Sequence, residues 1–170
     1  MDKVYQNWQW KHNASMTDRG RIILSWHPRR YQFNLILKTN QLIHGEAIQL
    51  STNKKFYITF VYGRNLEEQR IPSWDDLISS SQSLEDSWCV LGDFNSMLNQ
   101  GERIGGIEVT NGEISDFAAC IKHCGLIDKA PHNELWYKGF AYTYTKDKGF
   151  KDMVKHSLAQ NQRGSSLNTL

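Results

Sequence analysis

The chain has 170 residues, which is enough for one domain with a single core and too few for two domains of ordinary size. Hydrophobic residues make up 39% and charged residues 22%, a composition that excludes disorder over most of the chain. The formal net charge of +2 is too small to indicate nucleic-acid binding by bulk electrostatics, and we expect the basic clusters to be solvated surface. No apolar segment reaches the roughly 20 residues of a membrane span, and the amino terminus has no secretory signal, so we expect an intracellular protein.

Alternating and continuous apolar patterns predict strands in the first half of the chain. They cover residues 21–26, 31–38 and 43–50, the third being weaker. Residues 55–62 alternate most clearly and carry apolar side chains on both faces, which is typical of a central strand covered on two sides.

Two helices are predicted further along. The segment after Pro72 has apolar residues near helical spacing, which predicts a surface helix. A better marked helix covers residues 111–124, because Thr110 and Glu113 have capping-box spacing and Gly125 is a typical helix stop. Short strands are predicted at residues 126–130 and 140–145, with a disordered tail from residue 160.

Three cysteines, an odd number, argue against a closed disulfide framework. Cys120, His123 and Cys124 lie within about one helical turn, but no second pair of zinc ligands follows at a usual spacing. We therefore expect the two cysteines to face the core. The sequon at residues 13–15 has no secretory context that would give it meaning.

The apolar run at residues 88–91 ends in Gly92, which lets the chain turn, and then in Asp93 and Asn95. Polar side chains at positions i and i+2 of an extended segment point to the same side, so these two can converge on a phosphate or a hard metal ion. Taken alone, the same pattern also fits an Asx turn that terminates a strand.

A second pair of polar residues follows the clearest predicted strand. Tyr62 ends that strand and Asn65 lies three residues later, although Tyr62 alone also fits an ordinary strand-end tyrosine. Strands that alternate with helices suggest a layered α/β sandwich, in which strand-end polar groups gather at one edge of the sheets. We expect a functional site at that edge.

With residues 62–65 (Tyr-Gly-Arg-Asn) and 92–95 (Gly-Asp-Phe-Asn) together, the chain resembles the endonuclease/exonuclease/phosphatase superfamily of divalent-metal phosphodiesterases. It is most similar to the endonuclease domain of plant LINE-type retrotransposons. The resemblance extends through the loop at residues 102–106, the segment at 116–128 and residues 142–144 (Tyr-Thr-Tyr), and covers residues 20–145.

The resemblance implies a four-layered αββα sandwich, here incomplete, and Mg²⁺-dependent hydrolysis of a DNA phosphodiester. Asp93 would align or deprotonate the attacking water, and Asn95 would hold the phosphate or the metal beside it. Tyr62 would stabilise the developing negative charge, Asn65 would position the phosphate, and Thr143 would support the site. A metal and fixed donors aimed at the nonbridging oxygens can remove several kcal/mol from the barrier to phosphodiester cleavage.

Two parts of the family's pattern are missing from this sequence. The family's principal Mg²⁺ ligand, a glutamate, has no counterpart, and neither does its closing Ser-Asp-His, since Ser115 and Asp116 are followed by Phe117 in a predicted helix. Asp152 corresponds either to the family's Asp-bearing strand or to a solvated tail. Catalytic groups that act as a unit do not leave proportionate residual rates, so we expect little or no catalysis. Missing strands also predict exposed sheet edges and poor solubility.

Three hypotheses follow. The first is a truncated, inactive LINE-type endonuclease, with a partial domain over residues 1–159 and a tail over residues 160–170, nuclear if functional. The second is a DNA-binding module without the chemistry. The third is an active phosphatase or nuclease with an atypical metal ligand such as Asp2 or Glu46, whereas Ser25 and His27 lack a third partner for nucleophilic chemistry. The oligomeric state stays open.

Overall fold

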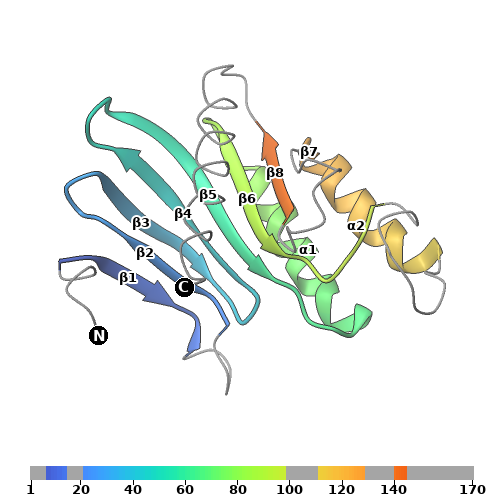
Figure 1. The fold of residues 1–170 in the computed structure, drawn as a ribbon. Helices are drawn as coiled ribbons and strands as arrows, with labels where there is room; N and C mark the ends of the chain where they lie inside the picture. The colour runs from blue at the N-terminus through green and yellow to red at the C-terminus, as the bar shows by residue number, and fades with distance from the viewer. Residues whose placement is uncertain (1–6, 15–20, 99–110, 129–139, 145–170) are drawn as a thin grey trace, which may run out of the picture.

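The computed structural model describes residues 7–14, 21–98, 111–128 and 140–144, which form two sheets and two helices (Figure 1). The larger sheet has the strand order β3-β4-β5-β6-β8-β7, and β1 pairs with β2 in a separate two-stranded sheet. The strands are β1 (Gln9–His12), β2 (Ile23–Trp26), β3 (Tyr31–Lys38), β4 (Leu42–Gln49), β5 (Lys54–Tyr62), β6 (Trp88–Asp93), β7 (Ile127–Asp128) and β8 (Phe140–Tyr144).

Strands β5 and β6 form the parallel pair of the large sheet. They are joined through α1 (Glu67–Ser81), whereas the other neighbouring strands run antiparallel. The register aligns Tyr62 with Asp93, so β5 and β6 end at the same edge of the sheet. This edge is where the sequence predicts the site.

Helices α1 and α2 (Asn111–His123) cover one face of the large sheet (Figure 1). The main core lies beneath them and includes the fully buried Leu77 and Trp88. Three aromatic rings hold the centre of this core, with ring centroids 4.9 Å apart for Trp74 and Phe117 and 5.1 Å apart for Phe94 and Phe117. Phe94 immediately follows β6, so this packing fixes the end of that strand.

The opposite face of the sheet carries a smaller apolar cluster. Its buried members are Ala47, Phe56 and Cys89. Trp26 of β2 packs against Phe33 of β3 with ring centroids 5.3 Å apart. The two-stranded sheet therefore contacts the face that the helices leave open.

Most predicted elements are confirmed. β3 has the expected bounds, β4 and β5 differ from expectation by one residue at their ends, and β5 is central in the sheet. The strand β1 was not predicted, because its side chains are mostly exposed and polar and produce no apolar pattern. Helix α2 matches its expected range closely, whereas Thr110 and residues 160–170 lie outside the described residues.

The predicted start of the first helix is wrong. α1 begins at Glu67, before Pro72, and includes the proline in its second turn. Glu67 and Glu68 lie in the first turn, where carboxylates interact favourably with the helix dipole. Arg70 donates hydrogen bonds to the carbonyl oxygens of Arg64 and Asn65, which attaches the start of α1 to the preceding loop.

Cys120 and Cys124 are buried, whereas His123 is exposed, which confirms the expected core-facing cysteine pair. Asn13 of the sequon is fully buried and its amide nitrogen donates to backbone carbonyls, so the attachment atom for a glycan is not accessible. Neither of the helices described is long and apolar enough to span a membrane.

Candidate phosphate site at the ends of β5 and β6

Gly92 allows β6 to approach β5 closely where both strands end. Its φ of 145° is rare for residues with a side chain, and a Cβ at this position would lie 1.9 Å from the carbonyl oxygen of Val61. Any larger residue would push the two strands apart. The glycine predicted to permit a turn therefore also sets the spacing between Tyr62 and Asp93.

Residues 93–95 form a tight turn held by Asp93. Its Oδ1 accepts a hydrogen bond of 3.1 Å from the backbone N–H of Asn95, which is the Asx turn that the sequence left open. Asn95 has a φ of 48°, so the expectation that Asp93 and Asn95 both lie in an extended segment is wrong. Asparagine tolerates this left-handed conformation better than most residues.

The turn nevertheless joins the loop after β5. Asn95 Nδ2 donates to the carbonyl oxygen of Gly63 at 2.7 Å and lies 3.5 Å from Asn65 Oδ1. The N–H of Gly63 in turn donates to the carbonyl oxygen of Asp93 at 2.7 Å. A Cβ on Gly63 would lie 2.2 Å from the carbonyl oxygen of Phe94, so the approach requires glycine here as well. Tyr62, Asn65, Asp93 and Asn95 are thus brought to one sheet edge.

Two buried side chains shape the loop that carries Asn65. Gln41 accepts from the N–H of Arg64 at 2.7 Å through its side chain, while its carbonyl oxygen accepts from the N–H of Tyr62 at 2.8 Å. Arg70 of α1 donates through Nη1 to the carbonyl oxygens of Arg64 and Asn65 at 3.1 and 2.9 Å. Neither residue was singled out from the sequence, because contacts of this kind leave no local pattern.

The sequence analysis also missed Arg21, which precedes β2. Its Nη1 donates to the phenol oxygen of Tyr62 at 2.7 Å, across 41 residues of chain. Since β2 belongs to the two-stranded sheet, this contact adds a cation from a second structural unit to the site. The sequence places Arg21 at the start of an apolar run, which indicates a strand and nothing about this contact.

Thr143 is not brought next to Asp93. In β8 it pairs with Cys89, four residues before Asp93 on β6, which corresponds to about 13 Å along the strand.

Glu46, considered as a substitute metal ligand, lies far from the site. It pairs with Tyr57, which pairs with Trp88 at the other end of β6, about 16 Å from Asp93 along the strand. The carboxylate is also engaged, since Lys55 Nζ lies 2.7 Å from Oε2 and the hydrogen bond from Lys55 holds the pKa of Glu46 below its ordinary value. Asp2, the other substitute, and Asp152 lie outside the described residues.

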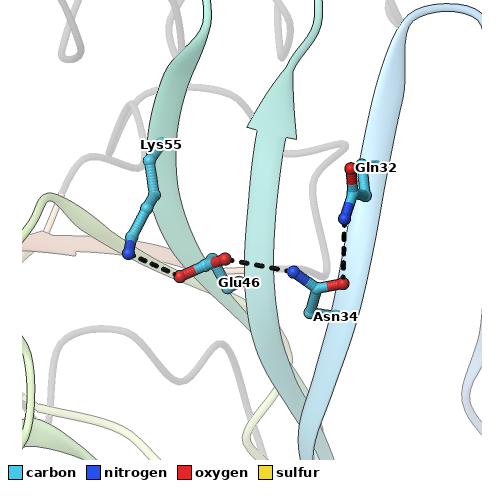
Figure 2. Close-up of polar contacts among 4 residues, drawn as sticks. All are labelled: Gln32, Asn34, Glu46 and Lys55. Atoms are coloured by element: carbon cyan, nitrogen blue, oxygen red, sulfur yellow. Dashed lines mark hydrogen bonds and ion pairs between the residues drawn. The ribbon is translucent and has the colours of Figure 1, made fainter.

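Figure 2 shows that Glu46 belongs to a polar ladder across three strands. Asn34 Nδ2 donates to Glu46 Oε1 at 3.1 Å, and Gln32 Nε2 donates to Asn34 Oδ1 at 3.3 Å. Cross-strand pairs of this kind support a sheet. The ladder therefore has a structural explanation that requires no ligand.

The described part of the site does not form a metal centre by itself. Among the described residues, no three His, Cys, Asp or Glu side chains lie close enough to hold one ion. Asp93 is the one carboxylate among the four residues gathered here, and one of its oxygens already accepts from the turn. Mg²⁺ requires near-octahedral oxygen coordination and uses one or two carboxylates with waters and substrate phosphates. These residues therefore supply one carboxylate ligand, and a complete Mg²⁺ site would also need waters, substrate phosphate or ligands from outside the described residues.

Comparison with known proteins identifies the fold. No protein-family model matches the chain, and no curated protein matches it. Among solved structures, it matches the catalytic domain of human Nocturnin at a TM-score of 0.51 and 16% identity, over 81% of this chain and 61% of that catalytic-domain chain. It matches an endonuclease/exonuclease/phosphatase from Bacteroides vulgatus at a TM-score of 0.51 and 13% identity, over 82% of this chain and 65% of that chain. It matches a mannosyl-6-phosphatase from Bacteroides thetaiotaomicron at a TM-score of 0.53 and 9% identity, over 82% of this chain and 64% of that chain.

The chain has the endonuclease/exonuclease/phosphatase fold. The expected α/β sandwich is therefore confirmed. The chain spans about three fifths of the length of these solved structures. At these identities the comparisons establish the fold, and the activity and the LINE origin remain matters for proposal.

Proposed function

We propose that the chain is a DNA-directed phosphodiesterase domain of LINE-type origin and that it has little or no hydrolytic activity by itself. Tyr62, Asn65, Asp93 and Asn95 form its phosphate side. The observation that supports this most directly is the hydrogen-bonded joining of the 93–95 turn to the loop after β5. It holds a carboxylate, a phenol and amide groups at one edge of the sheet. Thr143 is proposed as a support for the neighbouring strand.

Each group has a role that fits its chemistry. The phenol of Tyr62 and the amide of Asn65 can donate to nonbridging phosphate oxygens, where negative charge develops during attack. The carboxylate of Asp93 can accept a proton from an attacking water, because its Oδ2 takes no part in the turn. Asn95 holds the loop after β5 in place through Gly63.

The lack of activity follows from charge. A phosphodiester repels its nucleophile, and the described residues place one carboxylate beside the phosphate without a cluster of ligands for a neutralising metal ion. Mg²⁺ enters this proposal only if further ligands come from outside the described residues. The described residues thus supply groups that bind a phosphate and orient a water.

Nicking of supercoiled plasmid tests the proposal. The protein used must unfold cooperatively, which shows that it is folded. We expect that adding Mg²⁺ does not increase nicking by the wild-type chain, and that the wild type nicks no more plasmid than Asp93→Ala does. Mg²⁺-dependent nicking that Asp93→Ala abolishes would contradict inactivity and favour an active nuclease with an atypical ligand set.

DNA binding tests whether DNA uses this edge of the sheet. Without Mg²⁺, the nearly isosteric Asp93→Asn should bind DNA several-fold more tightly than the wild type, because it removes a negative charge facing the phosphate. Fluorescence anisotropy with labelled DNA measures this, with Asp86→Asn as the control at an exposed carboxylate elsewhere. Equal affinities of all three proteins would mean that DNA does not use this edge.

A further inference from the structure

Arg21 is an exposed arginine with an unusually well-defined position. Its guanidinium donates to the phenol oxygen of Tyr62 at 2.7 Å, and its central carbon lies 4.9 Å from the centroid of the Tyr62 ring. Arginine has donors only, so Tyr62 must be the acceptor in this hydrogen bond. The phenol hydrogen therefore stays available to another acceptor, and the guanidinium retains further N–H groups.

The backbone of Arg21 is fixed by a buried amide. Oδ1 of the fully buried Asn13 accepts from the N–H groups of Arg21 and Ile22, both at 3.1 Å. Nδ2 of Asn13 donates to the carbonyl oxygens of Thr39 and Asn40 at 3.3 and 3.1 Å. The side chain of Asn13 thus uses both ends to attach the start of β2 to the turn before β4.

The same turn leads directly to the loop of the site. Gln41 follows Asn40 and is 3% exposed. Its backbone carbonyl oxygen accepts a hydrogen bond from the N–H of Tyr62, and its side-chain oxygen accepts one from the N–H of Arg64. The buried side chain of Asn13 therefore attaches the backbone of Arg21 to the turn before β4, and Gln41 at the end of that turn attaches the backbone of Tyr62 to it. A solvated arginine needs no such framework, whereas a ligand-binding arginine gains affinity from being held in position.

Arg21 forms no ion pair with any residue that the structure describes. Over residues 7–14, 21–98, 111–128 and 140–144, the ion pair found joins Lys55 to Glu46, far from this edge. Arg70, 5% exposed beneath the loop, makes its hydrogen bonds to neutral carbonyl oxygens. Arg70 therefore places a second guanidinium group beneath the loop that follows Tyr62.

We propose that Arg21 is a phosphate-binding residue, which contacts a phosphate group of a DNA strand next to Tyr62. The planar guanidinium suits two nonbridging oxygens of one phosphate, with the phenol hydrogen of Tyr62 available to the same group. The inference rests on the proposed function, because it assigns the ligand to the same sheet edge. The phosphate is either an internal phosphodiester or a terminal monoester of the strand.

Arg21→Gln tests this inference, with Arg29→Gln as the matched control. Arg29 is an exposed arginine next to the same two-stranded sheet, and its replacement changes the net charge equally. Affinities are measured by anisotropy in EDTA with labelled single-stranded DNA, one oligonucleotide having a 5′-phosphate and one lacking it. EDTA removes any dependence on Mg²⁺ or on hydrolysis.

We expect Arg21→Gln to weaken binding about tenfold, the usual scale for a charge-assisted hydrogen bond, and Arg29→Gln to weaken it less than about twofold. A loss seen with both oligonucleotides identifies an internal phosphodiester as the ligand. A loss confined to the 5′-phosphorylated oligonucleotide identifies the terminal monoester. Arg21→Lys should recover only part of the affinity, because it restores the charge without the planar fork.

A purely structural role for Arg21 makes a different prediction. If Arg21 only held Tyr62 in place, replacing it would have no further effect once the phenol is removed by Tyr62→Phe. We expect Arg21→Gln to weaken DNA binding about tenfold also when it is added to Tyr62→Phe. The variants compared must have matched melting temperatures. Equal affinities of Arg21→Gln and Arg29→Gln, or loss of the Arg21 effect in Tyr62→Phe, would overturn the inference. Either result would leave the effect of Asp93→Asn untouched, so the two proposals fail independently.

Discussion

His44 is a buried polar side chain in a hydrogen-bonded group that joins β4, β5 and β6. Its Nδ1 lies 2.7 Å from the hydroxyl oxygen of Thr59, which also accepts from Trp88 Nε1 at 2.8 Å. The imidazole stacks on Tyr57 with ring centroids 5.9 Å apart. Burial lowers the pKa of His44 to about 4 from 6.5, because the charged form loses its hydration.

This pKa makes stability depend on pH. Between about pH 6.5 and pH 4 the unfolded chain binds a proton at His44 that the folded chain does not, so the free energy of unfolding falls as the pH is lowered through this range. We expect a loss of about 2 kcal/mol between pH 7 and pH 5 from this residue, measured by urea denaturation. His44→Gln should flatten that dependence, whereas His123→Gln, at an exposed histidine, should leave it unchanged.

At the scale of elements, the end of β6 is held by the helices through Phe94. This ring is fully buried, and its centroid lies 6.4 Å from that of Trp74 in α1 and 5.1 Å from that of Phe117 in α2. Asp93 and Asn95 flank it in sequence. Packing on the helix side therefore positions polar residues at the sheet edge.

Phe94→Ala should lower the free energy of unfolding by about 3–5 kcal/mol, because it removes a buried ring and leaves a cavity. Chemical denaturation measures the loss. Trp10→Ala replaces an aromatic residue that is 61% exposed and should have little effect. Comparable losses in the two variants would show that Phe94 does not anchor β6.

The elements differ in how far local sequence could predict them. Clear alternation predicts β5, and the polar residues after β5 and β6 predict a site at one edge, since both features depend on neighbouring residues. The contacts of Arg21 with Tyr62 and of Gln41 with Arg64 span 41 and 23 residues. They depend on how the sheets pack, and no local pattern carries that information. The conformation of Asn95 was missed for a related reason, because the hydrogen bond to Gly63 that accompanies it exists only once β5 and β6 have paired.

At the scale of the whole molecule, β3 forms an outer edge of the large sheet. Leu35 is 40% exposed and Ile36 is 58% exposed, at an irregularity in the pairing with β4. Exposed apolar residues on an edge strand promote pairing between copies. We therefore expect the β3 edge to promote self-association.

Ile36→Lys should reduce self-association without lowering the melting temperature, because the side chain is already exposed and a charge on an edge strand disfavours pairing. Light scattering over a concentration series measures the change. Gln82→Lys adds the same charge after α1, at an exposed position away from β3, and should reduce scattering less. An equal reduction in scattering by both variants would mean that the added net charge, and not the β3 edge, controls self-association.

The parallel register of β5 and β6 also links the site to the order of folding. Tyr62 and Asp93 become neighbours only after the chain has crossed through α1 and returned to pair in parallel, whereas β3, β4 and β5 pair through short connections. Partial opening of the β5–α1–β6 unit would separate Tyr62 from Asp93 and leave the antiparallel strands intact. The opening that separates Tyr62 from Asp93 should also expose the amide protons of β6 to exchange with solvent. A ligand that binds both residues would therefore slow the exchange of these protons.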